Sequence, residues 1–303
     1  MRTLLEAVFL GVVQGLTEFI PVSSSGHLVL VPHFLRLERP GLAFDVALHA
    51  GTFGAVVVYF RTDLRLMAQA VVGAGDPVLV AYHRRLIGLL ALGSVPIAVA
   101  GVLFQDLFEA AFASPHAAAV ALLVTGSLLL LGELARARRG GRTAPAGDGA
   151  DDAATDADRE ETAIGADPGD PGGLTLDRMG ARHALLVGLG QCVALFPGIS
   201  RSGTTITAGM TAGLTRPAAA RFSFLLALPA LVGASAVSLP DLASGEGVYG
   251  TPAIVAGVVA AFVSGYLAIR WLLALIARVR LTGFAIYCYV VGGASLVALQ
   301  VLG

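Results

Sequence analysis

Two stretches of this apolar chain are near copies of each other, and both carry polar residues that a membrane segment rarely tolerates. The first, QGLTEFIPVSSSGH, covers 14–27, and the second, QCVALFPGISRSGTT, covers 191–205. In each, Gln is followed five residues later by Phe and nine residues later by a Ser-x-Ser-Gly tetrapeptide. Apolar segments broken by Pro, Gly and hydroxyl residues in two halves predict interrupted helices that line a site within the membrane.

The composition predicts an all-α, polytopic membrane protein, which we expect to be a multi-pass protein of the plasma membrane. Hydrophobic residues make up 56% of the chain and charged residues 14%, against about 25% charged in soluble domains. A helix needs ~20 apolar residues to cross a bilayer. Apolar stretches of about that length predict six transmembrane helices, at about 44–60, 86–104, 117–134, 222–239, 252–275 and 283–302. The segments 4–37 and 183–214 are split by Pro21 and Pro197. They predict two re-entrant helical hairpins.

We expect a single integral membrane domain over 1–303. Arginines cluster in alternate connections, among them a loop predicted at 61–85, and the positive-inside rule assigns these connections to the inner face. Three predicted spans follow each hairpin, and an odd number inserts the two halves upside down relative to each other. The sequence therefore predicts an inverted-topology repeat, with repeat one at about 1–134 and repeat two at about 183–303, whose hairpin tips meet near the membrane midplane.

Residues 138–178 are predicted to be an acidic, disordered loop insertion. Between Pro145 and Gly172 the chain has nine acids and one basic residue, Arg159. Such a segment has too little apolar surface to fold and too much charge of one sign. The rest of the chain is basic but deeply apolar, so we expect membrane lipids as its surroundings and no nucleic acid as a partner.

The first near copy holds a carboxylate in an apolar run. Glu18 follows Gln14 by four residues, so both lie on one helix face, and an acid there costs about 2.5–3.5 kcal/mol on insertion scales, which indicates function. At the Pro break come three hydroxyls and an imidazole: Ser23, Ser24, Ser25 and His27. These groups and the freed N–H groups suit a phosphate site. The alternatives are a helix cap for the serines and a packed core histidine for His27, which its nearness to Glu18 in sequence disfavours.

The second near copy places Arg201 among hydroxyls. Arg grips phosphate oxygens in a bidentate manner, and its neighbours Ser200, Ser202, Thr204 and Thr205 add donors. An Arg that snorkels to the interface is the weaker interpretation, because the acidic loop lies about 20 positions away. A purely structural ion pair between Glu18 and Arg201 stays open as well.

At these residues the chain resembles the undecaprenyl-diphosphatase, or bacitracin-resistance, family. That family carries a Glu/Gln-x-x-x-Glu motif that runs into a PVSSSGH-like stretch, and a PGxSRSG motif followed by Thr. Here they stand at Gln14 to Glu18, Pro21 to His27 and Pro197 to Thr205. The resemblance implies hydrolysis of undecaprenyl diphosphate to the monophosphate and inorganic phosphate, with a divalent cation (Mg²⁺ or Ca²⁺) as cofactor. In that family, the reaction recycles the lipid carrier of cell-envelope synthesis.

The resemblance also implies a role for each motif residue. Glu18 matches a metal ligand or general base, and Gln14 holds the position of a further metal ligand that is Glu in some members. Ser24 and His27 match the residues proposed as nucleophile or general acid, and Arg201 matches the phosphate-binding arginine. We expect Gln14, Ser23, Ser25, Ser200, Ser202, Thr204 and Thr205 to contact the substrate.

Several alternatives remain open from the sequence. In one mechanism, His27 attacks the phosphorus and forms a phospho-enzyme. In the other, Glu18 and His27 activate a water molecule that Ser24 positions. Imidazole is the better nucleophile unless the serine has an adjacent base. A polyprenyl-phosphate flippase would use the same inverted repeat. A type 2 phosphatidic-acid-phosphatase-like enzyme would need a Lys, and the chain has none. A homodimer is possible.

Overall fold

The computed structural model describes residues 2–37, 41–103, 114–140, 173–237 and 249–302. These residues are mostly helical and form no strand, only an isolated bridge between Leu174 and Leu214. The helices of the first half are α1 Arg2–Phe19, α2 Ser24–Leu35, α3 Leu42–Tyr59, α4 Arg61–Val72, α5 Pro77–Leu103 and α7 Pro115–Gly140. A 3-10 turn, η1 Leu176–Arg178, precedes α9 Ala181–Val193, α10 Arg201–Ala212, α11 Arg216–Val237, α13 Thr251–Ile276 and α14 Thr282–Leu302.

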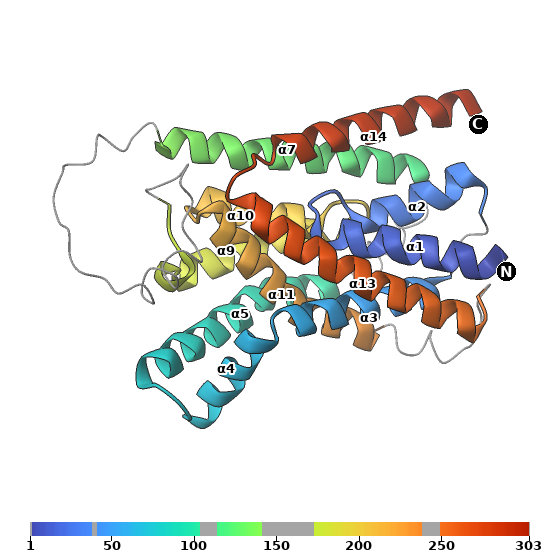
Figure 1. The fold of residues 1–303 in the computed structure, drawn as a ribbon. Coiled ribbons are helices and arrows are strands. Elements are labelled where there is room, and N and C mark those ends of the chain that lie inside the picture. The colour runs from blue at the N-terminus through green and yellow to red at the C-terminus, as the bar shows by residue number, and fades with distance from the viewer. Residues whose placement is uncertain (1, 38–40, 104–113, 141–172, 238–248, 303) are drawn as a thin grey trace.

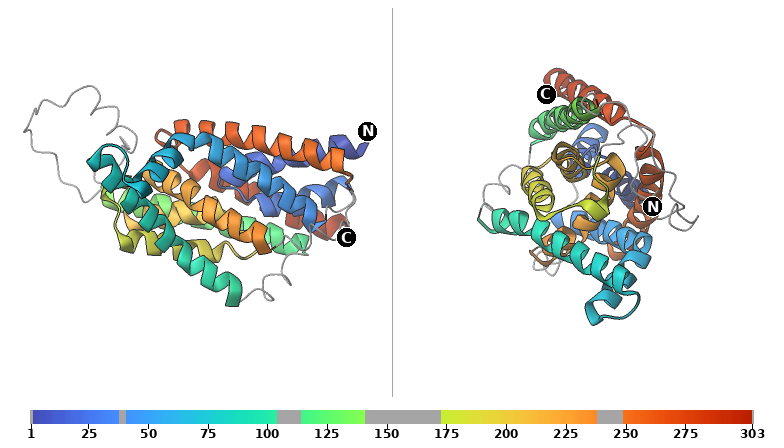
Figure 2. Two further views of the ribbon diagram at one scale, coloured as in Figure 1. Left: turned by 90° about the horizontal axis from the view of Figure 1, so that it is seen from below. Right: turned by 90° about the vertical axis from the view of Figure 1, so that its left-hand side faces the viewer.

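Most of the helices run along one common direction, as in a membrane bundle (Figure 1). Helix α1 begins and α14 ends at the same end of the molecule. Seen along the bundle, α7 and α14 form a pair at one edge, and α4 and α5 lie at the opposite edge (Figure 2). Helices α1, α9, α10 and α13 lie between these edges, so the two broken segments are held inside the bundle.

The predicted all-α membrane fold is confirmed. Four helices, α5, α7, α13 and α14, are each long and apolar enough to cross a membrane. A fifth crossing results if α3 and α4, bent by 73° at their junction, are counted as one broken span. Helix α11 lies where the sequence predicts a span but is not among these, so the count of six stays a prediction.

Two predicted boundaries are wrong. The stretch 61–85, predicted to be a loop, holds α4 and the first turns of α5, because Met67 and Ala70 give α4 a buried face and Gly73 ends it with φ 74°. The predicted insertion 138–178 is too long at both ends. Residues 138–140 belong to α7, and Leu174 bonds to Gly213 and Thr215 through its backbone. The acidic stretch 141–172 lies outside the described residues.

Close packing through small residues ties each hairpin to the bundle. A Cβ added to Gly11 would lie 2.3 Å from the carbonyl oxygen of Gly257, and one on Gly15 would lie 2.0 Å from Ser264 Oγ. The same close approach joins α9 to α5, where a Cβ on Gly188 would lie 2.3 Å from Gly93 O. Small residues allow such contact between membrane helices. Thus the first hairpin packs on a helix of the second half and the second hairpin on one of the first, as the predicted repeat requires; the repeat itself stays a prediction.

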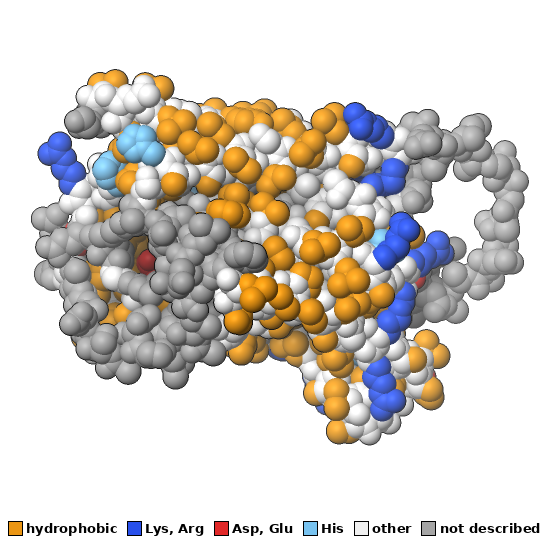
Figure 3. Space-filling view, turned by 180° about the vertical axis from the view of Figure 1, so that it is seen from behind, with side chains coloured by type: hydrophobic (Ala, Val, Ile, Leu, Met, Phe, Trp, Pro, Cys, Tyr) orange, Lys and Arg blue, Asp and Glu red, His pale blue; other side chains and the backbone are white. Residues whose placement is uncertain are grey.

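The surface separates an apolar belt from a basic end. On the face shown in Figure 3, hydrophobic side chains cover the middle of the molecule, and most Arg side chains gather at the end where α7 ends and α9 begins. This distribution is the one that the arginine-rich connections predict for the inner face.

Candidate active site

The tips of the two hairpins touch. The α1–α2 hairpin and the α9–α10 hairpin enter the bundle from opposite ends (Figure 1), and the backbone N–H of Gly198 donates to Ser25 Oγ at 3.1 Å. Gly198 has φ 86°, and a Cβ there would lie 2.8 Å from Ala121 Cβ. Only glycine suits this position without strain. The turn of the second hairpin can therefore approach both the first hairpin and α7.

Each tip starts a helix with the same serine cap. Ser23 Oγ accepts from Gly26 N at 3.2 Å, and Ser200 Oγ accepts from Gly203 N at 3.0 Å. A Ser cap satisfies one of the N–H groups that a helix leaves without an intrahelical partner. The N-termini of α2 and α10 thus converge at the meeting point of the tips.

Glu18 lies at this point and bonds to both hairpins. Its Oε2 accepts from Gln14 Nε2 at 3.0 Å and from Ser24 Oγ at 2.6 Å. Its Oε1 accepts from Arg201 Nη2 at 2.6 Å. The Glu18 side chain is 6% exposed and that of Arg201 15%. The predicted meeting of acid and guanidinium from two distant segments is therefore present in the fold, as an ion pair shielded from solvent.

The arrangement can bind an anion beside the carboxylate. Arg201 has five N–H donors and uses one on Glu18. Helix N-termini carry partial positive charge and unpaired N–H groups. The N–H groups of Ser24, Ser25, Arg201 and Ser202 make no hydrogen bond within the described residues. Two helix ends and a guanidinium that face one small region fit a phosphate group.

His27 is held away from the Glu18 carboxylate. Its Nδ1 lies 2.7 Å from Ser23 O, so that nitrogen donates, and Nε2 lies 2.8 Å from Tyr287 Oη. The two rings stack at 5.7 Å. No hydrogen bond or ion pair joins His27 to Glu18 within the described residues, although the two are near in sequence; both imidazole nitrogens are engaged elsewhere.

Of the hydroxyls predicted to bind substrate, some make contacts at the tips and others bond back to the backbone of α10. Ser25 joins the two tips, as described above. Ser202 lies 3.2 Å from Ser200 Oγ. Thr204 and Thr205 donate back to the carbonyl of Arg201 at 2.9 and 2.8 Å, and both are buried. In this state the two threonines stabilise the first turn of α10 and the position of Arg201.

Three residues near the site were missed or underrated in the sequence. His49 Nε2 lies 3.8 Å from Glu18 Oε2, so the imidazole beside the acid comes from α3. Thr125 Oγ1 accepts from Ser200 N at 3.1 Å and fixes the second tip to α7. Tyr287, on α14, contacts His27. His49 follows Asp45 by four residues, which was a weak signal, and the other two had none.

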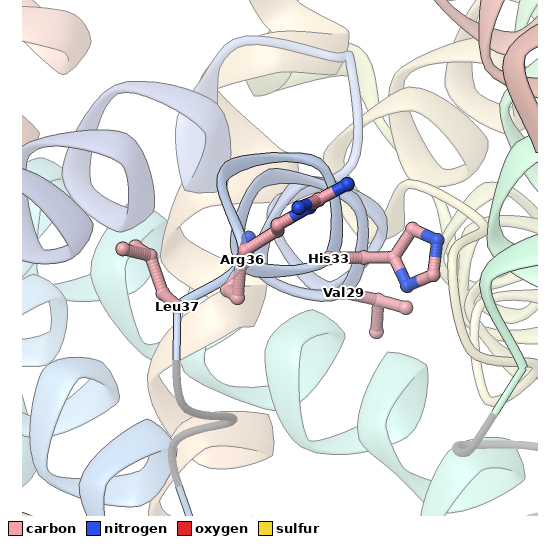
Figure 4. A pocket seen from close by; sticks show the side chains of 5 residues that line it. Val29, His33, Arg36 and Leu37 are labelled. Carbon is pink, nitrogen blue, oxygen red and sulfur yellow. The ribbon is translucent and has the colours of Figure 1, made fainter. Parts of the chain in front are cut away.

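A surface pocket of about 200 Å³ lies at the end of α2 and is lined by Val29, Pro32, His33, Arg36 and Leu37 (Figure 4). None of these residues belongs to the predicted site.

The residues present fit a cation only when a substrate supplies further ligands. The described part of the chain has no cluster of three or more His, Cys, Asp and Glu that could hold a metal. Gln14 Oε1, however, is buried and makes no hydrogen bond within the described residues. It lies on the residue that bonds the Glu18 carboxylate. One carboxylate and one free amide oxygen suit Mg²⁺, which takes few protein ligands and completes its shell with phosphates and water.

Comparisons with known proteins agree with one another over almost the whole chain. The family model described as "Bacitracin resistance protein BacA" matches residues 7–294. The undecaprenyl-diphosphatase of Rubrobacter xylanophilus is 41% identical and both chains are covered completely. Those of Syntrophotalea carbinolica and Methanobrevibacter smithii are 40% and 36% identical; each alignment covers 95% of this chain, and 96% and 95% of the relative.

Proposed function

The chain belongs to the bacitracin resistance protein BacA family, and we propose that it hydrolyses undecaprenyl diphosphate to the monophosphate and inorganic phosphate. The observation that carries the proposal is the ion pair between Glu18 and Arg201, with Ser24 bonded to the same carboxylate. These groups come from two hairpins and meet inside an apolar bundle. Their chemistry suits a phosphoric anhydride carried on a lipid, and recycling of a lipid carrier follows from that reaction.

The substrate's two parts match two parts of the molecule. A polyprenyl tail is insoluble in water and lies among membrane lipids along the apolar belt. The diphosphate needs positive charge and N–H donors, which Arg201 and the N-termini of α2 and α10 supply. Phosphoryl transfer depends mainly on such positioning and charge stabilisation.

Ser24 is the group best placed to attack the terminal phosphorus. An activated nucleophile needs a base within hydrogen-bond reach, and Ser24 Oγ donates to Glu18 at 2.6 Å. Glu18 takes the proton as the Ser24 Oγ–P bond forms, and the anhydride P–O bond breaks to release polyprenyl monophosphate. Water then hydrolyses the phosphoserine. His27, whose Nε2 lies against Tyr287 Oη, would need that hydroxyl to move before it could attack.

We propose Gln14 and Glu18 as the protein ligands of a divalent cation, Mg²⁺ or Ca²⁺. A bound cation would neutralise phosphate charge and so allow a diphosphate to approach the Glu18 carboxylate. Gln14 presents a free buried oxygen for this purpose. Phosphate release after removal of divalent cations should fall and return on addition of Mg²⁺ or Ca²⁺.

Phosphate release from undecaprenyl diphosphate in detergent tests the reaction, because a micelle has no two sides and transport alone releases nothing. We expect release by the wild type and none above background by Glu18→Ala or Arg201→Ala. Release that survives in both variants would refute the site. No observation here favours the flippase alternative.

A trapped intermediate tests the nucleophile. We expect acid-stable phosphoserine in the wild type and none in Ser24→Ala, with Ser25→Ala as the control at the neighbouring hydroxyl. An acid-labile phosphoryl group on His27 would assign the attack to the imidazole instead.

A further inference from the structure

A second pocket lies at the basic end of the bundle, where α3 and α13 end and α11 begins. Its volume is about 300 Å³, and its lining comes from α3, α11 and α13: Tyr59, Pro217, Arg221, Arg270, Leu273 and Ala274. No residue of the candidate active site contributes to it. Two guanidinium groups beside tyrosine and aliphatic side chains make it a site for an anion with an apolar neighbour.

The pocket lies at the depth of the membrane interface. Arg221 is five residues from the start of α11, and Arg270 is six residues from the end of α13. At 1.5 Å per residue each lies roughly 7–9 Å from its helix end. Trp271, beside Arg270, is 50% exposed, and Trp is typical of the interface between headgroups and hydrocarbon.

The two arginines differ in their contacts. Arg221 donates to Asp63, and its guanidinium lies 5.6 Å from the centre of the Phe60 ring. These contacts fix its orientation and neutralise its charge. Arg270 is exposed and makes no hydrogen bond or ion pair within the described residues. The pocket thus keeps one positive charge without an acidic partner.

Arg270 ends an exposed apolar strip on α13. Val263, Leu267, Arg270 and Ala274 recur at helical spacing on one face and are all exposed. Val263 is 49% exposed and Leu267 54%. An acyl chain that lies along this strip from the centre of the bilayer ends with its headgroup at Arg270.

We propose that this pocket binds the phosphate headgroup of an anionic phospholipid from the leaflet at the basic end. Arg270 supplies the free charge, Arg221 adds oriented N–H donors, and an acyl chain covers Val263 and Leu267. Basic pockets between membrane helices bind anionic headgroups in this way. The proposal does not depend on the reaction at the hairpin tips.

Native mass spectrometry of the full chain, released from mixed micelles of phosphatidylglycerol and phosphatidylcholine, tests the site. We expect the wild type to retain one phosphatidylglycerol in preference to phosphatidylcholine. Arg270→Gln should lower that preference about fivefold, the effect of one arginine at an anionic surface. Arg278→Gln is the matched control, since it removes an exposed arginine just beyond α13 that does not line the pocket.

Two results would overturn the proposal. One is an equal loss of phosphatidylglycerol from Arg270→Gln and Arg278→Gln, which would mean only general attraction to the basic end. The other is complete displacement of the lipid by inorganic phosphate, which would mean a free phosphate site. Arg270→Lys, which keeps the charge on an exposed position, should retain most of the lipid and so separates loss of charge from loss of fold.

Discussion

At the start of α2 and at the start of α10, a serine caps the helix and the next residue contacts Glu18. In the first hairpin these residues are Ser23 and Ser24, and in the second they are Ser200 and Arg201. Ser24 bonds one carboxylate oxygen and Arg201 bonds the other, each at 2.6 Å. Equivalent positions of two similar hairpins therefore hold one acid between them.

The helices that lead into the two tips differ in a single respect that matters for chemistry. Gln14 is followed four residues later by Glu18 and donates to it. Gln191 is followed four residues later by Leu195, and neither polar atom of its buried side chain makes a hydrogen bond within the described residues. The first hairpin contributes the carboxylate, and the second contributes the guanidinium. Two similar hairpins thereby produce a site with two unlike halves.

The two turns also reach their caps by different backbone routes. In the first, Ser23 itself has φ 73°, while in the second Ser200 has φ −67° and the positive φ falls on Gly198. A non-glycine residue in this region costs of order 1–3 kcal/mol. The first tip is therefore strained at its capping residue, and the second is not.

The strongest test of the comparison neutralises the shared acid, Glu18, or its arginine partner, Arg201. Glu18→Gln and Arg201→Gln should each lower phosphate release about 10³-fold, as expected for loss of a base or of a main charge donor. Because the two side chains bond each other, the double variant should be little worse than either single one. Rates from undecaprenyl diphosphate in detergent give this cycle.

Independent losses that multiply in the double variant would contradict a shared site. Asp177→Asn, in η1, is the control for a neutralised acid, because the Asp177 side chain is 63% exposed. Its phosphate release should stay within about twofold of the wild type, since surface changes away from such features have small effects.

The paired glutamines sharpen the comparison at the next level. Gln14→Leu should lower phosphate release about 10- to 100-fold, the usual effect of removing a group that orients a reactive ligand. Gln191→Leu should leave the rate unchanged. It should also raise the Tm, because a buried polar group without a partner costs about 1–3 kcal/mol. A rate loss in Gln191→Leu as large as that in Gln14→Leu would show that both halves act in the chemistry.

The sequence predicts the meeting of the two hairpins but not its details. The spacing from Gln to the Ser-x-Ser-Gly tetrapeptide is the same in both near copies, so the predicted repeat leads us to expect that Glu18 meets Arg201. The sequence does not identify the hydroxyl that bonds Glu18, because closeness in sequence is not closeness in space. Ser24, on the first turn of α2, reaches the carboxylate, whereas His27 turns toward Tyr287 on the last helix.

Contacts between elements far apart in the chain account for what the sequence misses. His49 and Thr125 reach the site from α3 and α7 and follow no local pattern. The loop predicted at 61–85 fails for another reason. Its arginines are typical of a connection at the inner face, but α4 buries one face and exposes the charged one.

Glycine at the second tip permits a smaller but separate test. Gly198→Ala places a side chain at φ 86° and 2.8 Å from Ala121 Cβ, so the free energy of unfolding should fall by about 2 kcal/mol or more. Gly213→Ala is the control, because φ is 112° there and the nearest atom to an added Cβ is 3.8 Å away. Thermal unfolding in detergent should show the larger loss for Gly198→Ala. Equal losses would mean that the approach to α7 is relaxed.

The smallest expected effect is on stability, and its sign differs between the two capping serines. Ser200→Gly removes a cap from an unstrained position and should destabilise by a few tenths of a kcal/mol. Ser23→Gly loses the same cap but relieves φ 73°, so the relief of about 1 kcal/mol or more outweighs the loss and the Tm should rise. Each variant loses one further serine contact, to Ser202 or to Ser25, so the comparison is matched. Destabilisation of similar size in both would mean that the turn at Ser23 carries no strain, and the two hairpins would then differ in chemistry alone.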